Sequence, residues 1–317
     1  MEQGDALTFS STLQALDLLD SAHASGERVA RAIREAGIDA VEVARVTGDA
    51  GPTDFIRIRI SGTAGRTAGG SAPTLGIIGV LGGIGARPHQ VGMVSDADGA
   101  TAAIACALKL AKMRREGDAL PGDVLISTHI CPTAPLKPHD PVPFVTSPVS
   151  GEILNREQVR PEMDAIVAVV TTRGNRVINH RGFAISPTVK AGWILRPAPD
   201  LLDIQQNVTG KLPVVLPLTM PDLTPNSNGL YHLNTVVEPA QVTDAPVVGV
   251  ALTSAVPVAG SATGASPASD IEQAVRFTLE VAKAFGAGRC RFHDEAEWAR
   301  IQALYGSMKI LQSPGRQ

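Results

Sequence analysis

Two aspartates, Asp96 and Asp98, lie in the stretch SDADGAT (residues 95–101), where an apolar run gives way to an alanine-rich run. An aspartate at the start of a helix can accept hydrogen bonds from the free N–H groups of the first turn, which is helix capping. A carboxylate at the same place can instead bind a divalent metal ion. The sequence leaves both interpretations open for both aspartates.

Two histidines accompany these carboxylates. His89 lies in the loop that leads to SDADG, and His129 ends the apolar run DVLISTHI. Imidazole and carboxylate together are the ligand set of zinc and similar hydrolytic metals. We therefore predict His89, Asp96 and His129 as ligands of zinc or another divalent metal ion, with Asp98 or Asp140 orienting them through hydrogen bonds. No fixed local spacing such as HExxH is present, so the prediction depends on separate loops meeting in space.

A cysteine close to His129 offers a different chemistry. Cys131 follows the histidine by two residues, and a thiol becomes a nucleophile when a neighbouring base activates it. His129 or His139 could supply that base. The alternative is an inert, half-buried thiol. Together with the residues of the predicted metal site, this gives three candidate catalytic residues: His129, Asp98 and Cys131.

The elements around SDADG determine whether these residues meet. The apolar runs at 74–82 and 123–129 are predicted strands, and residues 99–115 between them are a predicted helix with basic residues in its last turn. Strand, helix and strand in this order form a crossover unit with parallel strands. Both strands then end on the same side of the sheet, where α/β proteins bind ligands. We expect the candidate residues to converge in a crevice at this edge.

The composition favours a large aliphatic core. The chain has 317 residues, of which 44% are hydrophobic and only 3% aromatic. Aliphatic runs of this kind suit a sheet that is buried on both faces between helices. We predict the α/β class: one domain over residues 1–317, in three layers, with a mixed, mostly parallel sheet and helices on both faces. A further strand is expected at 212–218 and a short helix at 231–238.

Charge and cysteine usage exclude several classes of protein. The formal net charge is −3 and no basic patch recurs, so a nucleic-acid partner is not expected. No apolar run reaches the roughly 18 residues of a membrane span, and the N-terminus has no signal-peptide pattern. The three cysteines are widely spaced, which is typical of reduced thiols in the cytoplasm. We expect a cytoplasmic protein without a membrane partner.

Two segments of the chain resemble the co-catalytic zinc exopeptidases, the superfamily of aminopeptidases and carboxypeptidases. In that superfamily an aspartate that bridges two zinc ions comes three residues before a glycine at the start of a helix, and Asp96 with Gly99 matches this pattern. The resemblance covers residues 74–130 and 246–286. It implies a zinc-exopeptidase-like fold, a divalent metal, a small peptide-like or amide substrate, and a homo-oligomer. As a whole, the chain is also similar to a bacterial and archaeal family designated domain of unknown function 1177.

The sequence departs from the exopeptidase pattern at three places. Gly82, Gly83 and Ile84 stand where the superfamily has a His-x-Asp motif, HICP stands where it has a Glu-Glu pair, and the last loop lacks its histidine. Our first hypothesis is a metal-dependent hydrolase of a peptide-like or amide substrate. The alternative is a non-catalytic binding or assembly protein that kept the fold and lost its metal ligands. A third hypothesis is a thiol hydrolase that uses Cys131.

Overall fold

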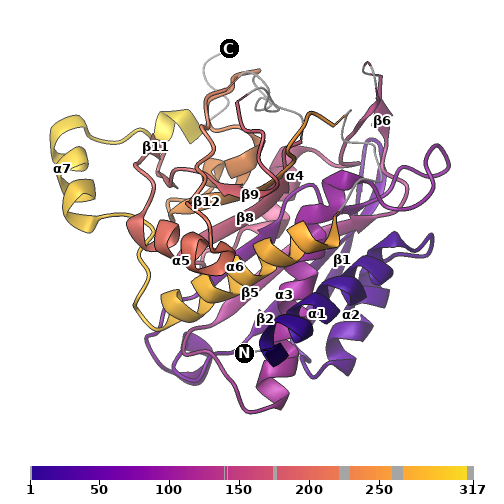
Figure 1. The fold of residues 1–317 in the computed structure, drawn as a ribbon. Helices are drawn as coiled ribbons and strands as arrows, with labels where there is room; N and C mark the ends of the chain where they lie inside the picture. The colour runs from indigo at the N-terminus through magenta and orange to yellow at the C-terminus, as the bar shows by residue number, and fades with distance from the viewer. Residues whose placement is uncertain are drawn as a thin grey trace.

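A computed structural model of the chain describes residues 2–138, 140, 142–173, 177–220, 229–258 and 267–312 (Figure 1). Within these residues ten strands form one mixed sheet in the order β1-β2-β5-β3-β8-β12-β10-β11, with β4 beside β5 and β9 beside β12. The strands of this sheet are β1 (Val41–Gly48), β2 (Gly51–Ile60), β3 (Leu75–Gly79), β4 (Gly83–Ile84), β5 (Val124–Cys131), β8 (Ala165–Thr171), β9 (Gly182–Ile185), β10 (Val189–Lys190), β11 (Trp193–Ile194) and β12 (Val247–Thr253). A separate small hairpin joins β6 (Leu136–Lys137) to β7 (Phe144–Val145).

The centre of the sheet is parallel and fully buried. Strands β5, β3, β8 and β12 lie side by side in the same direction, whereas β1, β2, β9, β10 and β11 pair antiparallel at the two sides. Every residue of β3, β5 and β12 is buried. A strand covered on both faces has no solvent side, so its apolar run is continuous rather than alternating. This confirms the predicted mixed sheet and α/β class.

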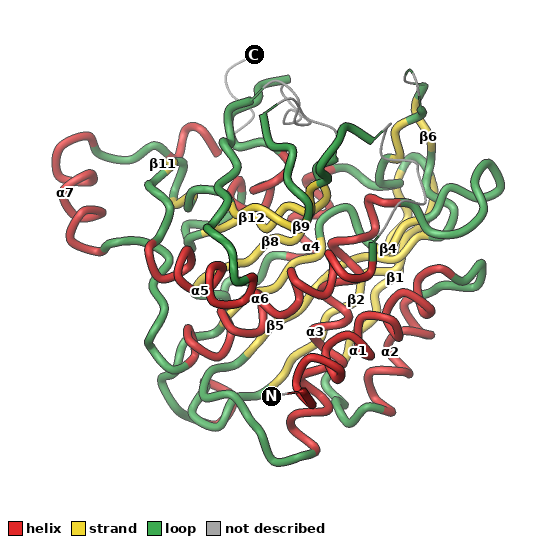
Figure 2. The backbone as a smooth tube through the Cα atoms, in the orientation of Figure 1, coloured by secondary structure: helices red, strands yellow, loops and turns green. Residues whose placement is uncertain are grey.

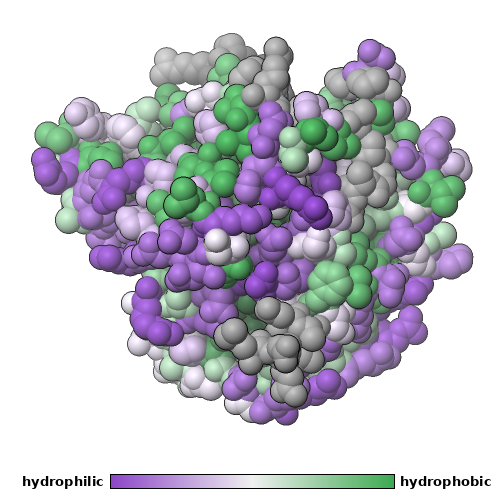
Figure 3. All heavy atoms as spheres, in the orientation of Figure 1, coloured by the Kyte–Doolittle hydropathy of each residue, from purple (hydrophilic) through white to green (hydrophobic). Residues whose placement is uncertain are grey.

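Most of the α-helices cover one face of the sheet, as the red segments of Figure 2 show. They are α1 (Glu2–Asp20), α2 (Gly26–Glu35), α3 (Asp98–Arg115), α5 (Pro199–Thr209) and α6 (Ala268–Gly286), which share one hydrophobic core with the sheet. Their outer surface over α5 and α6 is mostly hydrophilic (Figure 3). The other face carries the short helix α4 (Gly151–Gln158), the 3₁₀ segment η3 (Thr235–Gln241) and irregular chain. The three layers are confirmed, but the second helical layer is thin.

The remaining helical segments lie outside these layers or within connections. Helix α7 (Glu295–Tyr305) projects from the side of the molecule and contains no buried residue (Figure 1). Short 3₁₀ turns are η1 (Arg66–Ala68), η2 (Ser95–Ala97) and η4 (Lys309–Gln312). Among the described helices, none has both the length and the hydropathy that a membrane span requires.

The predicted crossover unit is present. Strand β3 runs parallel to β5, and α3 connects them while packing against β3, β5 and β8. Helix α6 lies beside α3, where Cys106 Sγ approaches the Val275 carbonyl oxygen to 4.0 Å. Strands β3 and β12, which precede α3 and α6 in the chain, both run parallel to β8, so each helix follows the carboxyl end of a strand at the same edge of the sheet.

Two local predictions were wrong. Residues 212–218 form no strand: Val215 makes only an isolated bridge to Ile185 of β9. Pro213 and Pro217 flank this contact and have no N–H group, so a continuous ladder of hydrogen bonds cannot form. The helix expected at 231–238 is instead the 3₁₀ segment η3, which begins later and contains Pro239.

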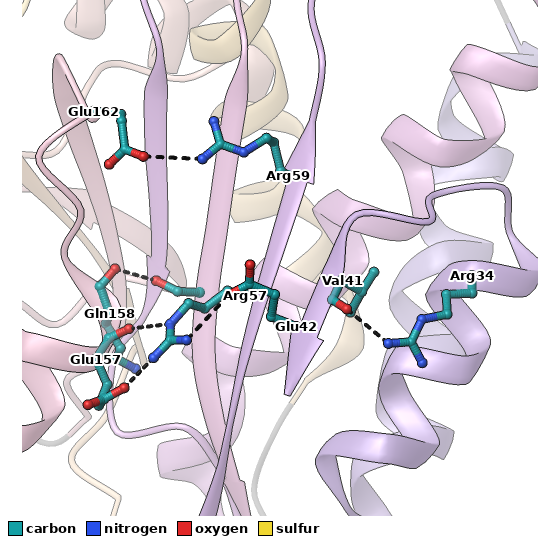
Figure 4. A network of polar contacts seen from close by, with 9 residues as sticks. Arg34, Val41, Glu42, Arg57, Arg59, Glu157, Gln158 and Glu162 are labelled. Atoms are coloured by element: carbon teal, nitrogen blue, oxygen red, sulfur yellow. Dashed lines mark hydrogen bonds and ion pairs between the residues drawn. The ribbon is translucent and has the colours of Figure 1, made fainter. Parts of the chain in front are cut away.

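Polar contacts attach α4 to the face of the sheet that carries the thin second layer (Figure 4). Arg57 of β2 donates from Nε to the Glu157 carbonyl oxygen at 2.9 Å and also pairs with the Glu157 carboxylate. Ser127 of β5 donates to the Gln158 carbonyl oxygen at 2.8 Å. These bonds satisfy carbonyl groups at the C-terminal end of α4, which a helix leaves without internal partners. They fix the layer that lies over β2 and β5.

The close approach of α3 to β8 gives the first prediction. A Cβ atom on Gly99 would lie 2.2 Å from the Val169 carbonyl oxygen, so only glycine fits there. We expect Gly99→Ala to lower the free energy of unfolding by on the order of 3 kcal/mol, because overpacking would push α3 from the sheet. The matched control is Gly210→Ala, where φ is +65° and the space is open; strain alone should cost about 1 kcal/mol. Equal costs in urea denaturation would contradict the packing argument.

Candidate functional site

The candidate site lies where the parallel strands end. The chain leaves β3 through Val80, whose N–H bonds to the Val169 carbonyl oxygen of β8 at 2.9 Å. Leu81 and Gly82 then adopt left-handed conformations with φ of 66° and 77°. A positive φ is costly for leucine, and such strain is concentrated at functional sites. This sharp turn lies at the edge where the four parallel strands β3, β5, β8 and β12 end. The helices α3 and α6 follow β3 and β12 at the same edge.

A buried ion pair joins two of these segments. Arg173, two residues beyond the end of β8, binds the Asp98 carboxylate through Nη2, and Asp98 is the first residue of α3. The Arg173 and Asp98 side chains are only 4% and 0% exposed. Beside the pair, Thr171 donates from Oγ1 to the Ser95 carbonyl oxygen at 2.9 Å. Strands β3 and β8 are neighbours, so the start of α3 and the end of β8 are brought together directly.

Two buried charges such as those of Asp98 and Arg173 must lie in close contact with each other. Removing a carboxylate and a guanidinium from water costs several kcal/mol each, and mutual attraction offsets that cost only in good geometry. The N-terminus of α3 adds a favourable partial positive charge near Asp98. Among the described residues, Nε of Arg173 has no hydrogen-bond partner. The Arg173 guanidinium is therefore paired with Asp98 through Nη2, while its Nε remains as one buried donor.

The capping interpretation of the two aspartates was wrong. The residue that precedes α3 as its N-cap is Ala97, which has no side-chain acceptor. Asp96 lies one residue earlier, within η2, and is 5% exposed. Asp98 is already inside the helix and binds Arg173. Both carboxylates are buried at the strand edge, and neither occupies the N-cap position of α3.

His129 is committed to the contact between β5 and β2. Its side chain is fully buried, its Nδ1 lies 2.8 Å from Thr53 Oγ1, and its ring centroid lies 5.6 Å from that of Phe55. Burial lowers the pKa of His129 to about 4, and the Leu81 backbone opposes this shift only in part. The ring also packs against Gly82, where a Cβ atom would lie 2.6 Å from Nε2. The imidazole is therefore held neutral by burial and enclosed at the contact between β5 and β2.

The structure does not assemble the predicted metal ligands. His89 is exposed in a turn that follows the cis peptide bond Arg87–Pro88, whereas Asp96 and His129 are buried. In the part of the chain that the structure describes, no group of three or more His, Cys, Asp or Glu side chains is arranged to hold a metal ion. The described residues therefore do not fit a divalent metal, and the ligand roles stay a prediction. The alternative ligand or base His139 lies outside the described residues.

Cys131 has the surroundings of a structural thiol. It is buried, and its Sγ donates to the Pro52 carbonyl oxygen at 3.5 Å. Burial raises the pKa of the Cys131 thiol, and the charge of Asp54 adds to the shift. A nucleophilic cysteine needs a lowered pKa instead. Hydrogen bonds from Thr133 and the charge of Arg45 oppose the shift, but the pKa of Cys131 stays raised, so the thiol does not have the surroundings of an activated nucleophile.

The sequence analysis missed Arg173, although a signal was present. Arg173 comes directly after the apolar run AIVAVVTT of β8, just as His129 ends the run of β5. The reasoning that selected polar residues at strand ends applies equally to this arginine. His180 and Arg181 follow in the same connection, and Arg181 forms a pair with Asp270 of α6 in which the arginine is exposed and the aspartate is buried.

Comparisons with known proteins agree with the fold. The sequence matches, over residues 44–315, the family described as “Protein of unknown function (DUF1177)”. No curated protein matches it. Among solved structures, a mutant of tomato leucine aminopeptidase is similar with a TM-score of 0.53 and 11% identity, covering 87% of this chain and 61% of that chain. The Legionella pneumophila LapA aminopeptidase has a TM-score of 0.48 and 11% identity, covering 89% and 75%. The Porphyromonas gingivalis glutaminyl cyclase has a TM-score of 0.49 and 9% identity, covering 87% and 96%.

At this low identity, the comparison with the tomato enzyme shows the fold alone. The exopeptidase-like fold that the sequence suggested is confirmed. The chain spans about three fifths of the tomato enzyme's length.

The buried histidine gives a prediction about pH. The folded pKa of His129 is about 4 and its reference value is 6.5, so the unfolded chain binds this proton more readily. Stability is then unaffected above pH 6.5 and falls as pH drops from 6.5 to 4, by about 3 kcal/mol at full effect. We expect His129→Gln to flatten the pH dependence of the unfolding free energy in this window.

Wild type and His129→Gln are compared by the slope of the unfolding free energy against pH, because the substitution also changes the absolute unfolding free energy. Between pH 7 and 8 the imidazole is neutral in both states, so wild type and variant should have parallel curves there. Parallel curves from pH 6.5 to 4 as well would contradict the burial argument.

Proposed function

Because the chain belongs to the family described as “Protein of unknown function (DUF1177)”, which names no activity, we propose a function from the candidate site itself. The protein binds a small peptide-like or amide compound at the carboxyl edge of β3, β8 and β12, without hydrolysing it. It is a binding protein built on an aminopeptidase-like fold.

The observation that carries this proposal is the buried pair between Asp98 and Arg173 at that edge. Hydrolysis of an amide needs a group that accepts a proton from water or from a nucleophile. The Asp98 carboxylate is already bound to a guanidinium, and the His129 ring is enclosed between Thr53 and Phe55. The Cys131 thiol is held in its protonated form by burial. All three catalytic candidates are thus engaged in structural contacts.

The ligand class follows from the fold and from the surface of the edge. The tomato relative is named as a leucine aminopeptidase, and peptide-like compounds are the corresponding ligands for this chain. Val177 and Val256 lie in the loops that leave β8 and β12, and these residues are 51% and 64% exposed. Apolar side chains at a strand edge suit the apolar part of a small ligand. Binding here would use the usual ligand position of an α/β sheet.

Metal-dependent hydrolysis is the second candidate function. It is favoured by Asp96, a buried carboxylate two residues before α3, at the position that resembles the zinc-bridging aspartate of the exopeptidases. This candidate requires zinc or another divalent metal and further ligands beyond those that the described residues assemble. It predicts that added metal leads to cleavage of a dipeptide or dipeptide amide, which the experiment below would detect.

The test is a panel of dipeptides and dipeptide amides, added with and without Mn²⁺ or Zn²⁺. We expect at least one compound to raise Tm, since a ligand at 100 times its Kd stabilises the folded state by about 2.7 kcal/mol. Mass spectrometry of the same mixtures should detect no cleavage. Val256→Asp should weaken binding, whereas Leu304→Asp on α7, at a similarly exposed position, should not. Cleavage that depends on metal would establish the second candidate, and a panel without any Tm shift would contradict binding.

A further inference from the structure

We infer that the guanidinium of Arg173 is the resident cation of the strand edge, beside the segment SDADG in which the sequence predicts a metal-binding aspartate. It neutralises the buried carboxylate of Asp98 and so makes the edge independent of metal. The inference deepens the proposed function and rests on it only for the location of the site.

The first step of the argument is the local charge. Asp96 and Asp98 are two buried carboxylates within three residues. Burying a carboxylate is unfavourable unless a positive group compensates it. The N-terminus of α3 contributes only about half of one positive charge. A full positive charge is therefore needed at this edge, and Arg173 supplies it against Asp98.

The second step is the identity of that cation. Zinc takes at least three protein ligands in its usual sites, and the described residues contain no such group. A guanidinium stays charged at every physiological pH and matches a carboxylate in shape. The Arg173 side chain is only 4% exposed and is thus almost as buried as the carboxylate of Asp98. The arginine therefore meets both requirements that a metal ion would otherwise meet, charge and position.

The third step is that the backbone delivers the arginine to this position. The register of β3 and β8 pairs Gly79 with Val169, and Gly99 packs against the carbonyl oxygen of the same valine. The start of α3 is thus pressed onto β8 a few residues before Arg173. The guanidinium reaches Asp98 because the crossover holds the two chain segments in contact.

A second arginine provides a matched control. Arg181 pairs with Asp270 at the start of α6, in the same way that Arg173 pairs with Asp98 at the start of α3. The Asp270 side chain is also buried, but the Arg181 side chain is 70% exposed. Water can replace an exposed guanidinium, so the two pairs should differ in their response to substitution.

The experiment measures Tm of metal-stripped protein with and without millimolar Mn²⁺, an ion that prefers oxygen ligands. Wild type should show no rise in Tm with Mn²⁺. Arg173→Gln should lower Tm by on the order of 10 °C, and Mn²⁺ should restore part of the loss. Arg181→Gln should change Tm little and show no response to Mn²⁺. In the double variant Asp98→Asn with Arg173→Gln, the response should disappear.

Two results would overturn the inference: a rise in wild-type Tm with Mn²⁺, or an Arg173→Gln variant that folds and ignores Mn²⁺. If Arg173→Gln does not fold, the response of the wild-type Tm to Mn²⁺ still tests the inference. The titration contains no peptide, so its failure leaves the ligand-binding result untouched. A peptide panel without any Tm shift would likewise leave the metal result intact.

Discussion

The ion pair between Asp98 and Arg173 connects the first residue of α3 with the chain that leaves β8, and the carboxyl edge of the sheet is organised around it. A charged pair removed from water must be closely matched, because each unpaired partner would cost several kcal/mol. The segments that present the two side chains are therefore held in fixed positions. Those segments are the start of α3 and the two residues that follow β8, Thr172 and Arg173.

The rest of the fold supplies the rigidity that this pair needs. Four parallel strands are buried on both faces, so the positions of their carboxyl ends are fixed by ladder hydrogen bonds and by packing. Gly79 and Gly99 allow the backbone of α3 to pack directly against β3 and β8. His129 and Thr53 join β5 to β2 on the opposite side of the sheet. Polar side chains that looked available for chemistry are thus used to hold strands and helices together.

The sequence predicted the fold better than the site, for a physical reason. The strands at 74–82 and 123–129 and the helix at 99–115 follow from local patterns of apolar residues, and all three are present. The partner of Asp98 is 75 residues away in the chain, and no local pattern indicates such a contact.

The same limit explains the individual errors at the site. Capping by the aspartates was wrong because α3 begins at Asp98 itself rather than after it. His129 ends an apolar strand, as predicted, but the pairing of β5 with β2 decides that its ring meets Thr53 and Phe55. Arg173 could have been selected by its position after β8, whereas its contact with Asp98 required the tertiary structure.

The most direct measurement is a double-mutant cycle between the two members of the pair. The unfolding free energies of wild type, Asp98→Asn, Arg173→Gln and the double variant give the coupling between the side chains. If the buried pair organises the edge, the coupling should be at least about 2 kcal/mol, and the double variant should be more stable than the two single costs together suggest. Costs that add within about 0.5 kcal/mol would show that the two charges act independently and would contradict the account.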